Sequence, residues 1–366
     1  MKIIFTADIH IKRTVWSHHP EIEGDALEAL CQIKDLALSL KQDDDVALII
    51  GGDLFNATRS TADLVQAATN MLLDLTVNGI KVYAIQGNHD RDKIPWTDLA
   101  SVEHMHGQGA IKIGNHFFTG FDYMPLSDIQ GALAAVPAQT EVLVCHQALK
   151  EALTFENAVG QGVWNLESEW IPSWVKLVLA GDIHHPNTYD LPGGGKLIYP
   201  GTPWMWRINE VHRKTVVVLD DDLNIERMPI KARPFTCFNI SDQEGLDVLV
   251  KAVNKHKPDE TIPEQIRKPV YRVLYSTQIP QVVGVLADLV KLDKVHILQE
   301  PVAVAQSDSE ESSPTHSGIS MIDCLPEAVD RDKDPRLFSF LHDLLEADQP
   351  AVYLTDELKK AEGRSI

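Results

Sequence analysis

The sequence predicts an α/β protein, because short apolar runs typical of strands alternate with amphipathic segments typical of helices over the first 230 residues. The same alternation restarts on a smaller scale after Arg233 and Pro234. In the first part, each of the main apolar runs also ends in a short polar segment. These three observations indicate a large α/β unit followed by a small one.

The strands of the large unit are predicted from apolar runs rich in β-branched residues, at residues 2–7, 46–50, 81–85, 141–145 and 176–180. Further strands are expected at residues 117–123, 196–199 and 215–219, so a second sheet is predicted. Two helical stripes lie between the runs: Leu27, Leu30, Cys31 and Leu38, and then Leu64, Ala68, Met71, Leu72 and Leu75. The second stripe closes at Asn78 and Gly79, which is a helix stop signal.

Four segments follow from these patterns: residues 1–230, 231–305, 306–318 and 319–366. The second is a compact βαβαβ unit with strands at 235–240, 270–276 and 295–298 and helices at 244–256 and 282–292. The third, QSDSEESSPTHSG, is expected to be a flexible linker because it is rich in serine and acids. The fourth is a helical tail whose apolar face consists of Leu337, Phe338, Leu341, Leu344 and Leu345.

The charge of the chain is strongly acidic, with 33 basic and 53 acidic residues among 366 and a formal net charge of -20. Such a balance normally argues against a nucleic-acid partner. The acids are unevenly spread, however: residues 231–305 hold 10 basic and 9 acidic residues, whereas residues 1–230 hold 17 and 30. Only the small unit therefore lacks an acidic excess.

The cellular setting is predicted from what the sequence lacks. No apolar run reaches 18 residues and no basic, apolar leader is visible, so neither a membrane span nor a signal peptide is expected. The four cysteines stand far apart without zinc spacing, so neither disulfides nor structural zinc are expected. A reducing, cytoplasmic location fits these features.

The candidate site consists of polar residues that follow five of the strands. They are Asp8 and His10 after the first, Asp53 after the second, Asn88, His89 and Asp90 after the third, His146 at the fourth, and Asp182 and His184 after the fifth. Ligands of α/β sheets bind outside the carboxyl ends of strands, so these residues are expected to meet in one crevice. Carboxylate, imidazole and amide groups suit manganese, iron or zinc better than magnesium alone. A carboxylate such as Asp53 can bridge two ions about 3.5 to 4 Å apart.

Each motif taken singly has an ordinary structural explanation. An Asp-x-His sequence can cap a helix or end a strand, and Gly-Asn-His-Asp can form a turn. The order of the motifs, each at the end of a strand, favours the metal site over these explanations.

The motifs resemble those of a known family. DIH at residues 8–10, GGD at 51–53, GNHD at 87–90 and GDIH at 181–184 are similar to the signatures of calcineurin-like metallophosphoesterases. GDLF at 52–55, GDIHHP at 181–186 and YPGTP at 199–203 resemble the SbcD branch, the nuclease subunits of a DNA repair complex. The motif likeness covers residues 1 to about 205.

The resemblance implies a four-layer α/β/β/α sandwich, with residues 231–305 as a capping domain that orients DNA. It implies two divalent metal ions, manganese or alternatively magnesium. Asp8, His10, Asp53 and His184 would hold the first ion, and Asp53, Asn88, His146 and Asp182 the second. His89 would face the scissile phosphate with Asp90 orienting its ring, and a hydroxide between the metals would attack in line.

Asp182 departs from the family pattern, which has histidine at this position. We expect Asp182 to bind the second ion and to favour manganese or magnesium over zinc. The alternative is that Asp182 hydrogen-bonds its own loop while the second metal binds weakly.

Substrate contacts are less constrained by the sequence. Arg13 and Arg59 lie next to metal motifs, and Arg207 follows YPGTP, so these three are candidates for phosphate contacts. Trp204 and Trp206 could stack on a nucleotide, although packing is the more ordinary role.

The expected function is a manganese-dependent DNA nuclease, an exonuclease with hairpin endonuclease activity as a further option. The resemblance implies an SbcC-like ABC ATPase as partner, docked through its coiled coil on the tail, and a homodimer within a heterotetramer. Two alternatives stay open. One is a stand-alone phosphodiesterase for cyclic nucleotides or small diesters, and the other is a scaffold with a degenerate second metal site.

Overall fold

The computed structural model describes residues 1–14, 19–56, 60–90, 96–98, 102–152, 164–207, 210 and 212–302. The predicted linker at 306–318 and the predicted tail at 319–366 lie outside the described residues. Within the described residues, no helix is both long and apolar enough to cross a membrane. Cys31, Cys145 and Cys237 are free thiols.

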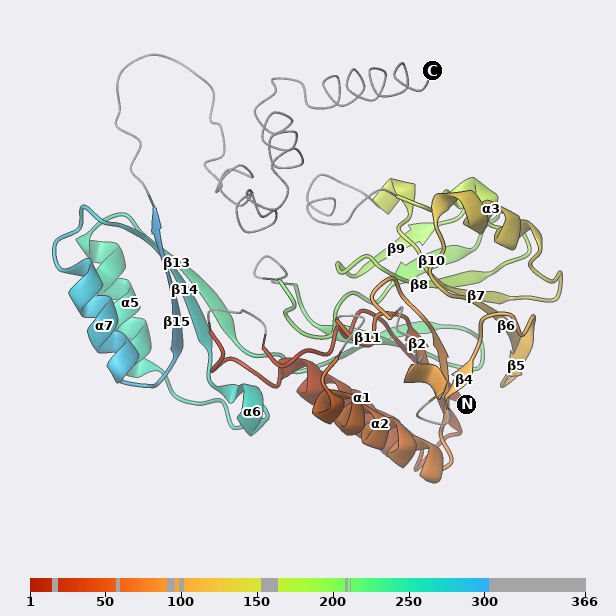
Figure 1. The fold of residues 1–366 in the computed structure, drawn as a ribbon, viewed down its shortest axis with the longest axis horizontal. Helices are drawn as coiled ribbons and strands as arrows, with labels where there is room; N and C mark the ends of the chain where they lie inside the picture. The colour runs from red at the N-terminus through yellow and green to blue at the C-terminus, as the bar shows by residue number, and fades with distance from the viewer. Residues whose placement is uncertain are drawn as a thin grey trace, which may run out of the picture. The chain divides into compact units, whose positions relative to one another are not determined.

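The first sheet contains the N-terminal strands and has six members (Figure 1). Their order is β12 (Ile225–Pro229), β11 (Thr215–Leu219), β1 (Lys2–Thr6), β2 (Val46–Gly51), β3 (Lys81–Ile85) and β4 (Glu103–His104). Strands β1 to β4 are parallel, while β11 and β12 continue the sheet in antiparallel pairing. The carboxyl ends of β1, β2 and β3 therefore lie along one edge of this sheet.

The second sheet also has six strands. Their order is β5 (Ile111–Ile113), β6 (His116–Phe121), β7 (Val142–His146), β8 (Leu177–Gly181), β10 (Lys196–Tyr199) and β9 (Asn187–Asp190). Strands β6, β7, β8 and β10 are parallel, and β5 and β9 are antiparallel edges.

The helices cover the outer faces of the two sheets. Helices α1 (Asp25–Leu40) and α2 (Ala62–Val77) lie side by side against the first sheet, and α3 (Leu126–Ala134) lies against the second (Figure 1). Short 3-10 turns η1 (Trp96–Asp98), η2 (Lys150–Ala152) and η3 (Ser168–Trp170) complete this part of the structure.

The side chains of successive strand residues point to opposite faces of each sheet, and this alternation explains why the sheets pack in layers. Ile3 and Phe5 of β1 point into the core between the two sheets, whereas Ile4 points into the core beneath α1 and α2. In β7, Val144 faces the inter-sheet core and Leu143 faces the core beneath α3. Because successive strand residues point to opposite faces, three apolar cores separate four layers. The predicted α/β/β/α sandwich is confirmed.

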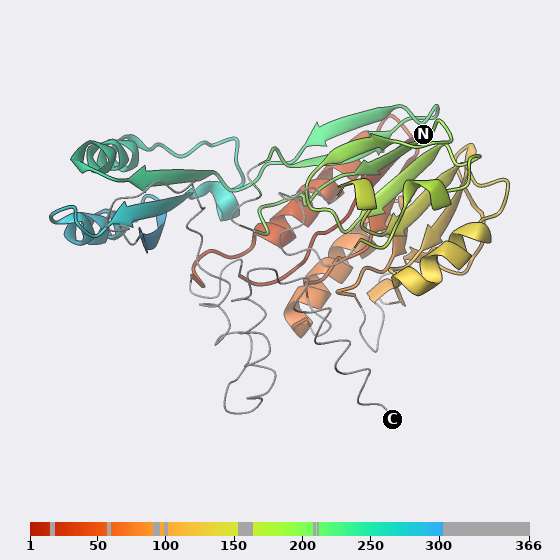
Figure 2. The same cartoon turned by 90° about the horizontal axis from the view of Figure 1, so that it is seen from above.

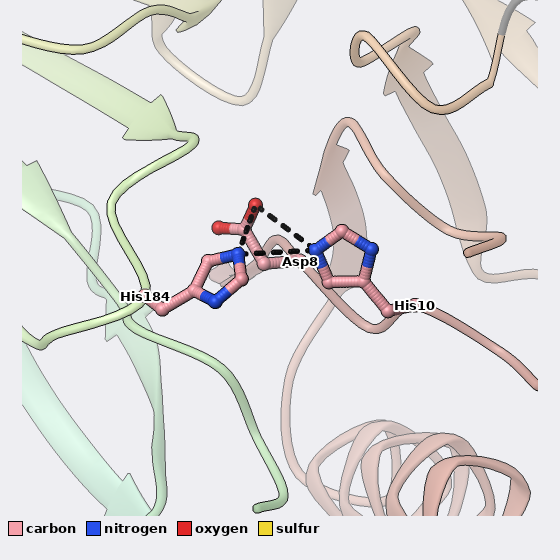
Figure 3. Close-up of side chains that lie close together, drawn as sticks. All are labelled: Asp8, His10 and His184. Carbon is pink, nitrogen blue, oxygen red and sulfur yellow. Dashed lines mark hydrogen bonds and ion pairs between the residues drawn. The ribbon is translucent and has the colours of Figure 1, made fainter. Parts of the chain in front are cut away.

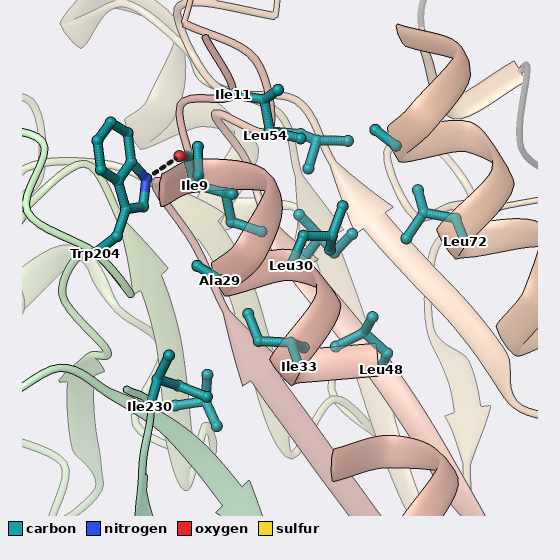
Figure 4. Close-up of a cluster of buried hydrophobic side chains, with 14 of the residues drawn as sticks. Ile9, Ile11, Ala29, Leu30, Ile33, Leu48, Leu54, Leu72, Trp204 and Ile230 are labelled. Carbon is teal, nitrogen blue, oxygen red and sulfur yellow. Dashed lines mark hydrogen bonds between the residues drawn. The ribbon is translucent and has the colours of Figure 1, made fainter. Parts of the chain in front are cut away.

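The core beneath α1 and α2 is drawn in Figure 4. Helix α1 buries Ala26, Ala29, Leu30, Ile33 and Ala37 in it. The predicted stripe was partly wrong, since Leu27, Cys31 and Leu38 are only half-buried, whereas most of the predicted α2 stripe is buried. Three of the buried residues of α1 are alanines, whose small side chains allow close packing of the helix. A prediction that relies on large apolar residues therefore places the buried face of α1 incorrectly.

Each strand that the sequence predicted for the large unit is present, with ends displaced by at most two residues. The strands that the sequence did not reveal are β4, β5, β9 and β12. They are short or exposed and lie at or next to sheet edges, where one face or both carry polar residues.

The small unit has the predicted βαβαβ order. Its three parallel strands are β13 (Phe235–Ile240), β14 (Val270–Ser276) and β15 (His296–Val302). Helices α5 (Gln243–Lys255) and α7 (Val282–Lys291) lie side by side (Figure 2), and a short helix, α6 (Glu264–Arg267), precedes β14. Leu249, Val273 and Leu286 are fully buried in a core of this unit's own.

A buried ion pair joins the small unit to the large one. Arg233, which is 8% exposed, donates to both carboxylate oxygens of Asp25 at 2.7 to 3.1 Å. Its remaining donors reach the carbonyl oxygens of Lys268, Glu23 and Gln265. Burial raises the pKa of Asp25 although Arg233 stabilises the charged form. Arg233 therefore holds together helix α1, the chain before it and the small unit.

We predict that Arg233→Leu destabilises the protein by about 3 to 5 kcal/mol, because it leaves the Asp25 carboxylate buried without its partner. The measurement is the free energy of unfolding in urea. Lys41→Ala removes one partner of the exposed pair with Asp45 and should cost at most about 1 kcal/mol. An Arg233→Leu protein as stable as Lys41→Ala would show that the buried pair does not hold the junction.

Candidate metal centre

The candidate ligands come from the carboxyl ends of strands in both sheets. Asp8 follows β1, Asp53 follows β2, His146 ends β7 and His184 follows β8. Asp8, Asp53 and His146 are at most 2% exposed, and His184 is 8% exposed. The two sheets thus place buried carboxylates and imidazoles at a common edge.

The first group consists of Asp8, His10 and His184 (Figure 3). The Nε2 atoms of the two histidines lie 3.1 Å apart. Oδ1 of Asp8 lies 4.0 Å from Nε2 of His10 and 3.9 Å from Nε2 of His184. Three potential ligand atoms from two sheets therefore face one point.

The second group shares Asp8 and adds Asp53 and His146. Nε2 of His146 lies 3.4 Å from Oδ2 of Asp53 and 3.7 Å from Oδ1 of Asp8. The same Asp53 oxygen lies 3.6 Å from Nε2 of His10, which belongs to the first group. Asp53 therefore stands between the two groups and could contribute to a metal site in either.

The donor atoms fit divalent metal ions. Nδ1 of His146 donates to the Gly51 carbonyl oxygen at 2.7 Å, so Nε2 is the nitrogen whose lone pair is free in the neutral ring. This Nε2 and Oδ1 of Asn88 are buried and make no hydrogen bond within the described residues. Buried acceptors without donors are costly, and a cation satisfies them.

The electrostatics of the site also call for positive charge. Burial raises the pKa of Asp8 to about 6. Burial acts in the same direction on Asp53, but the neighbouring histidines, His146 foremost, together outweigh it and hold the pKa of Asp53 below its ordinary range. Within the described part of the chain, neither carboxylate pairs with a lysine or arginine.

A match to a family model agrees with this geometry. Residues 1–201 match the model of the calcineurin-like phosphoesterases. The chain belongs to this family.

Curated relatives of this phosphoesterase include two archaeal proteins named DNA double-strand break repair protein Mre11. The protein from Saccharolobus solfataricus is 25% identical over 58% of this chain and 56% of its own length. The protein from Methanosarcina mazei is 24% identical over 73% of this chain and 44% of its own length. The phosphoesterase thus spans about half the length of the curated relatives it matches.

Among solved structures, the calcineurin-like phosphoesterase YfkN from Bacillus subtilis superposes with a TM-score of 0.36 at 10% identity. The superposition covers 63% of this chain and 88% of that one. An overlap this loose bears on neither substrate nor site.

The phosphoesterase holds several site residues in left-handed backbone. The φ angles are 55° at Asp8, 46° at His10, 51° at Asp53 and 88° at Asp182. Such conformations cost about 1 to 3 kcal/mol each in a non-glycine residue and cluster at functional sites. The turns after β1, β2 and β8 are therefore shaped to direct these side chains inward.

Two glycines next to the ligands allow close approach of the loops. Gly52 has a φ of 90°, and a Cβ there would lie 2.4 Å from Nδ1 of His146. A Cβ on Gly87 would overlap Oδ1 of Asp53. Any side chain at either position would displace a ligand.

Asp182 lies beside the second group. Its backbone N–H donates to the Asp8 carboxylate at 3.1 Å, and its own Oδ1 lies 3.9 Å from Nε2 of His146. Burial raises the pKa of Asp182, and its side chain keeps 21% exposure. The carboxylate is thus within reach of the ion that His146 would hold.

His89 is held by other groups than expected. Its backbone N–H donates to Oδ1 of Asp53 at 2.8 Å, and its Nδ1 donates to the Asn56 carbonyl oxygen at 2.8 Å. Asp90 instead accepts backbone N–H groups of Leu54, Phe55 and Gly87 at 3.0 to 3.3 Å. The expectation that Asp90 orients the His89 ring is corrected, because Asp90 pins the two ligand loops together and Asn56 orients the ring.

Glu210 is a residue that sequence analysis missed. Its Oε1 accepts from Nδ1 of His184 at 2.8 Å, and its Oε2 accepts from the Thr202 hydroxyl at 2.9 Å. Burial would raise the pKa of Glu210, but His184 and Lys214 lower it to about 2. A carboxylate on the far nitrogen fixes the ring and increases its basicity toward a metal. Glu210 follows no apolar run, so the strand-end pattern could not reveal it.

The predicted substrate contacts fall in different places. Arg13 is exposed and pairs with Asp63 on α2. Arg59 lies outside the described residues. Arg207 lies over the Trp206 ring, 4.5 Å from its centroid. Trp204 is buried in the core and donates to the Ile9 carbonyl oxygen (Figure 4), which confirms a packing role.

We predict that Asp182→Asn weakens binding of the second manganese ion by about 10- to 100-fold, because a neutral amide replaces a charged ligand. Asp182→His should shift the preference of this site from manganese toward zinc. Isothermal titration with both metals measures each effect, with Asp190→Asn on the exposed edge strand β9 as the control. Equal stoichiometry and affinity in all four proteins would remove Asp182 from the ligand set.

Proposed function

We propose that this phosphoesterase is a manganese-dependent nuclease that hydrolyses phosphodiester bonds of DNA. The observation that carries the proposal is the pair of buried carboxylates, Asp8 and Asp53, each within 4.0 Å of histidine nitrogens supplied by both sheets. Relatives named for DNA double-strand break repair support DNA as the substrate. Exonuclease action is proposed first, and cleavage of hairpins second.

Two ions would be held by the residues described above. Asp8, His10, Asp53 and His184 would hold one, and Asp53, Asn88, His146 and Asp182 the other. When bound, such ions activate water and neutralise the charge that develops on a phosphoryl group. Manganese is proposed over magnesium because three of the donors are imidazoles.

The protein's own groups prepare the site for this chemistry. His89, whose ring centroid lies 5.0 Å from that of His10, is assigned to the scissile phosphate. Because Nδ1–H of His89 is engaged by the Asn56 carbonyl, we assign to Nε2 the proton that a doubly protonated ring would transfer to the leaving oxygen, which would leave the neutral ring with its proton on Nδ1. Glu210 keeps Nε2 of His184 directed at the centre by binding Nδ1.

The test is degradation of end-labelled linear duplex DNA by the purified chain in manganese. We expect wild-type activity and a drop of at least about a hundredfold in Asp53→Asn, since the residue between the two groups is lost. Asp45→Asn, a matched change of an exposed acid, should leave the rate unchanged.

A small chromogenic phosphodiester is assayed in parallel. Hydrolysis of this ester without degradation of DNA would reject the nuclease in favour of a stand-alone phosphodiesterase. An Asp53→Asn protein as active as wild type on both substrates would reject the metal centre itself.

We further propose that the chain works with an ABC ATPase that carries a coiled coil, and that two copies pair as a homodimer within a heterotetramer. The support is the resemblance in the sequence and the apolar helical pattern of residues 337–345. We expect a chain ending at residue 318 to keep its phosphodiesterase activity and lose binding to the ATPase in sedimentation. Full binding by the shortened chain would exclude the tail as the docking segment.

A further inference from the structure

Trp206 lies directly beside the first ligand group. Its ring stacks on His10, with centroids 4.5 Å apart and planes 20° apart, and meets the ring of His184 edge-on at 4.7 Å. Its Nε1 donates to Oδ1 of Asn56 at 2.8 Å, and its backbone N–H donates to Glu210 at 3.1 Å. The indole is thus fixed by contacts to both proposed ligands and to the residues that orient the site.

Two cations lie over this fixed ring. The Lys12 ammonium is 5.3 Å and the Arg207 guanidinium 4.5 Å from the ring centroid. Both side chains are half-buried, and burial lowers the pKa of each. Attraction between a cation and the face of an indole offsets part of this desolvation and holds the charges in place.

Lys12 has no acidic partner to account for its position. Within the described residues, no carboxylate lies within ion-pair distance of its ammonium, although the chain carries 53 acidic residues. Glu210 raises the pKa of Lys12 from a distance and is itself bound to His184, Thr202 and the Trp206 backbone. A half-buried ammonium next to a phosphoesterase centre is thus placed to receive an anion from outside the chain.

We propose that Lys12 and Arg207, supported by Trp206, form a subsite for a second phosphate of the substrate, next to the phosphate that is cleaved. The proposal rests on the proposed phosphodiesterase function and names its substrate class as a chain with at least two phosphates. Trp206 is a positioning residue in this subsite. His10 covers its ring and the two cations lie over it, so the indole supports charges instead of stacking on a base.

The subsite also reconciles the acidic composition of the chain with a polyanionic substrate. A net charge of -20 repels nucleic acid at long range, so affinity must come from local cations. Lys12 lies two residues after His10, and Arg207 lies three residues before Glu210. The loops that carry these two site residues therefore also carry the two cations.

The test compares chromogenic esters that differ by one phosphate. They are the 4-nitrophenyl ester of thymidine 5′-phosphate with and without a 3′-phosphate, and that of thymidine 3′-phosphate with and without a 5′-phosphate. We expect wild type to prefer the doubly phosphorylated member of at least one pair, measured as a ratio of kcat/KM. Lys12→Met and Arg207→Met should each reduce this ratio about tenfold, the effect of one hydrogen bond to a charged group.

Three further variants separate the subsite from general effects. Lys196→Met removes an exposed lysine from β10 and should leave the ratio unchanged. Trp206→Phe should retain much of the preference for the doubly phosphorylated ester, whereas Trp206→Leu should lose it. On duplex DNA, Lys12→Met should lower the slope of log binding constant against log salt by about one.

The subsite is overturned if wild type shows no preference, or if Lys12→Met leaves the preference intact. It is also overturned if Lys12→Met slows all four esters equally, because Lys12 would then serve the charge balance of the metal centre. Failure of the proposed nuclease has a different signature, since DNA would stay intact while the esters are hydrolysed and the ratio would still decide the subsite.

Discussion

The structure depends on the burial of two carboxylates, Asp8 and Asp53, at the edge where both sheets end. Buried charges need compensation, and three histidines lie beside these carboxylates: His10 after β1, His146 at the end of β7 and His184 after β8. The left-handed turns at Asp8 and Asp53 and the glycine beside Asp53 exist to bring these groups within 4 Å. The two stacked sheets provide the rigid frame on which such costly turns are maintained.

Three histidines around the centre are held in the same way, whereas Nδ1 of His10 makes no hydrogen bond within the described residues. His89, His146 and His184 each donate Nδ1–H to an oxygen of another loop. These oxygens are the Asn56 carbonyl, the Gly51 carbonyl and the Glu210 carboxylate. The hydrogen bond fixes the tautomer, so Nε2 of each ring is left for the site. The supporting oxygens thus decide which atom of each ring is available, and the ligands alone do not define the site.

The sequence predicted those parts of the fold that local patterns determine. Strand ends were found because a buried parallel strand is a continuous apolar run, and the polar residue that follows it is conspicuous, as at Asp53 and His146. Edge strands such as β9 were not predicted because they are exposed on both faces and therefore lack an apolar run. The roles of Glu210 and of the Asn56 carbonyl were not predicted for a different reason. A contact between residues distant in the chain produces no periodic pattern in the sequence, and a backbone oxygen is not specified by any residue type. The α1 stripe was misjudged because three alanines share the buried face with Leu30 and Ile33, and alanine gives only a weak apolar signal.

The sharing of ligands between two sheets has a consequence for the lifetime of the protein. Asp8 and Asp53 follow strands of the first sheet, whereas His146 and His184 belong to the second. Elsewhere the sheets are joined by apolar packing and by polar contacts such as those of Arg227 with the Asn187 and Tyr199 carbonyl oxygens and of His104 with Asp122. An ion bound by ligands from both sheets would link the two sheets. Its binding would then stabilise the folded state by an amount that rises with the logarithm of the metal concentration. The supply of the metal would then govern how long the chain survives proteolysis, in addition to how fast it works.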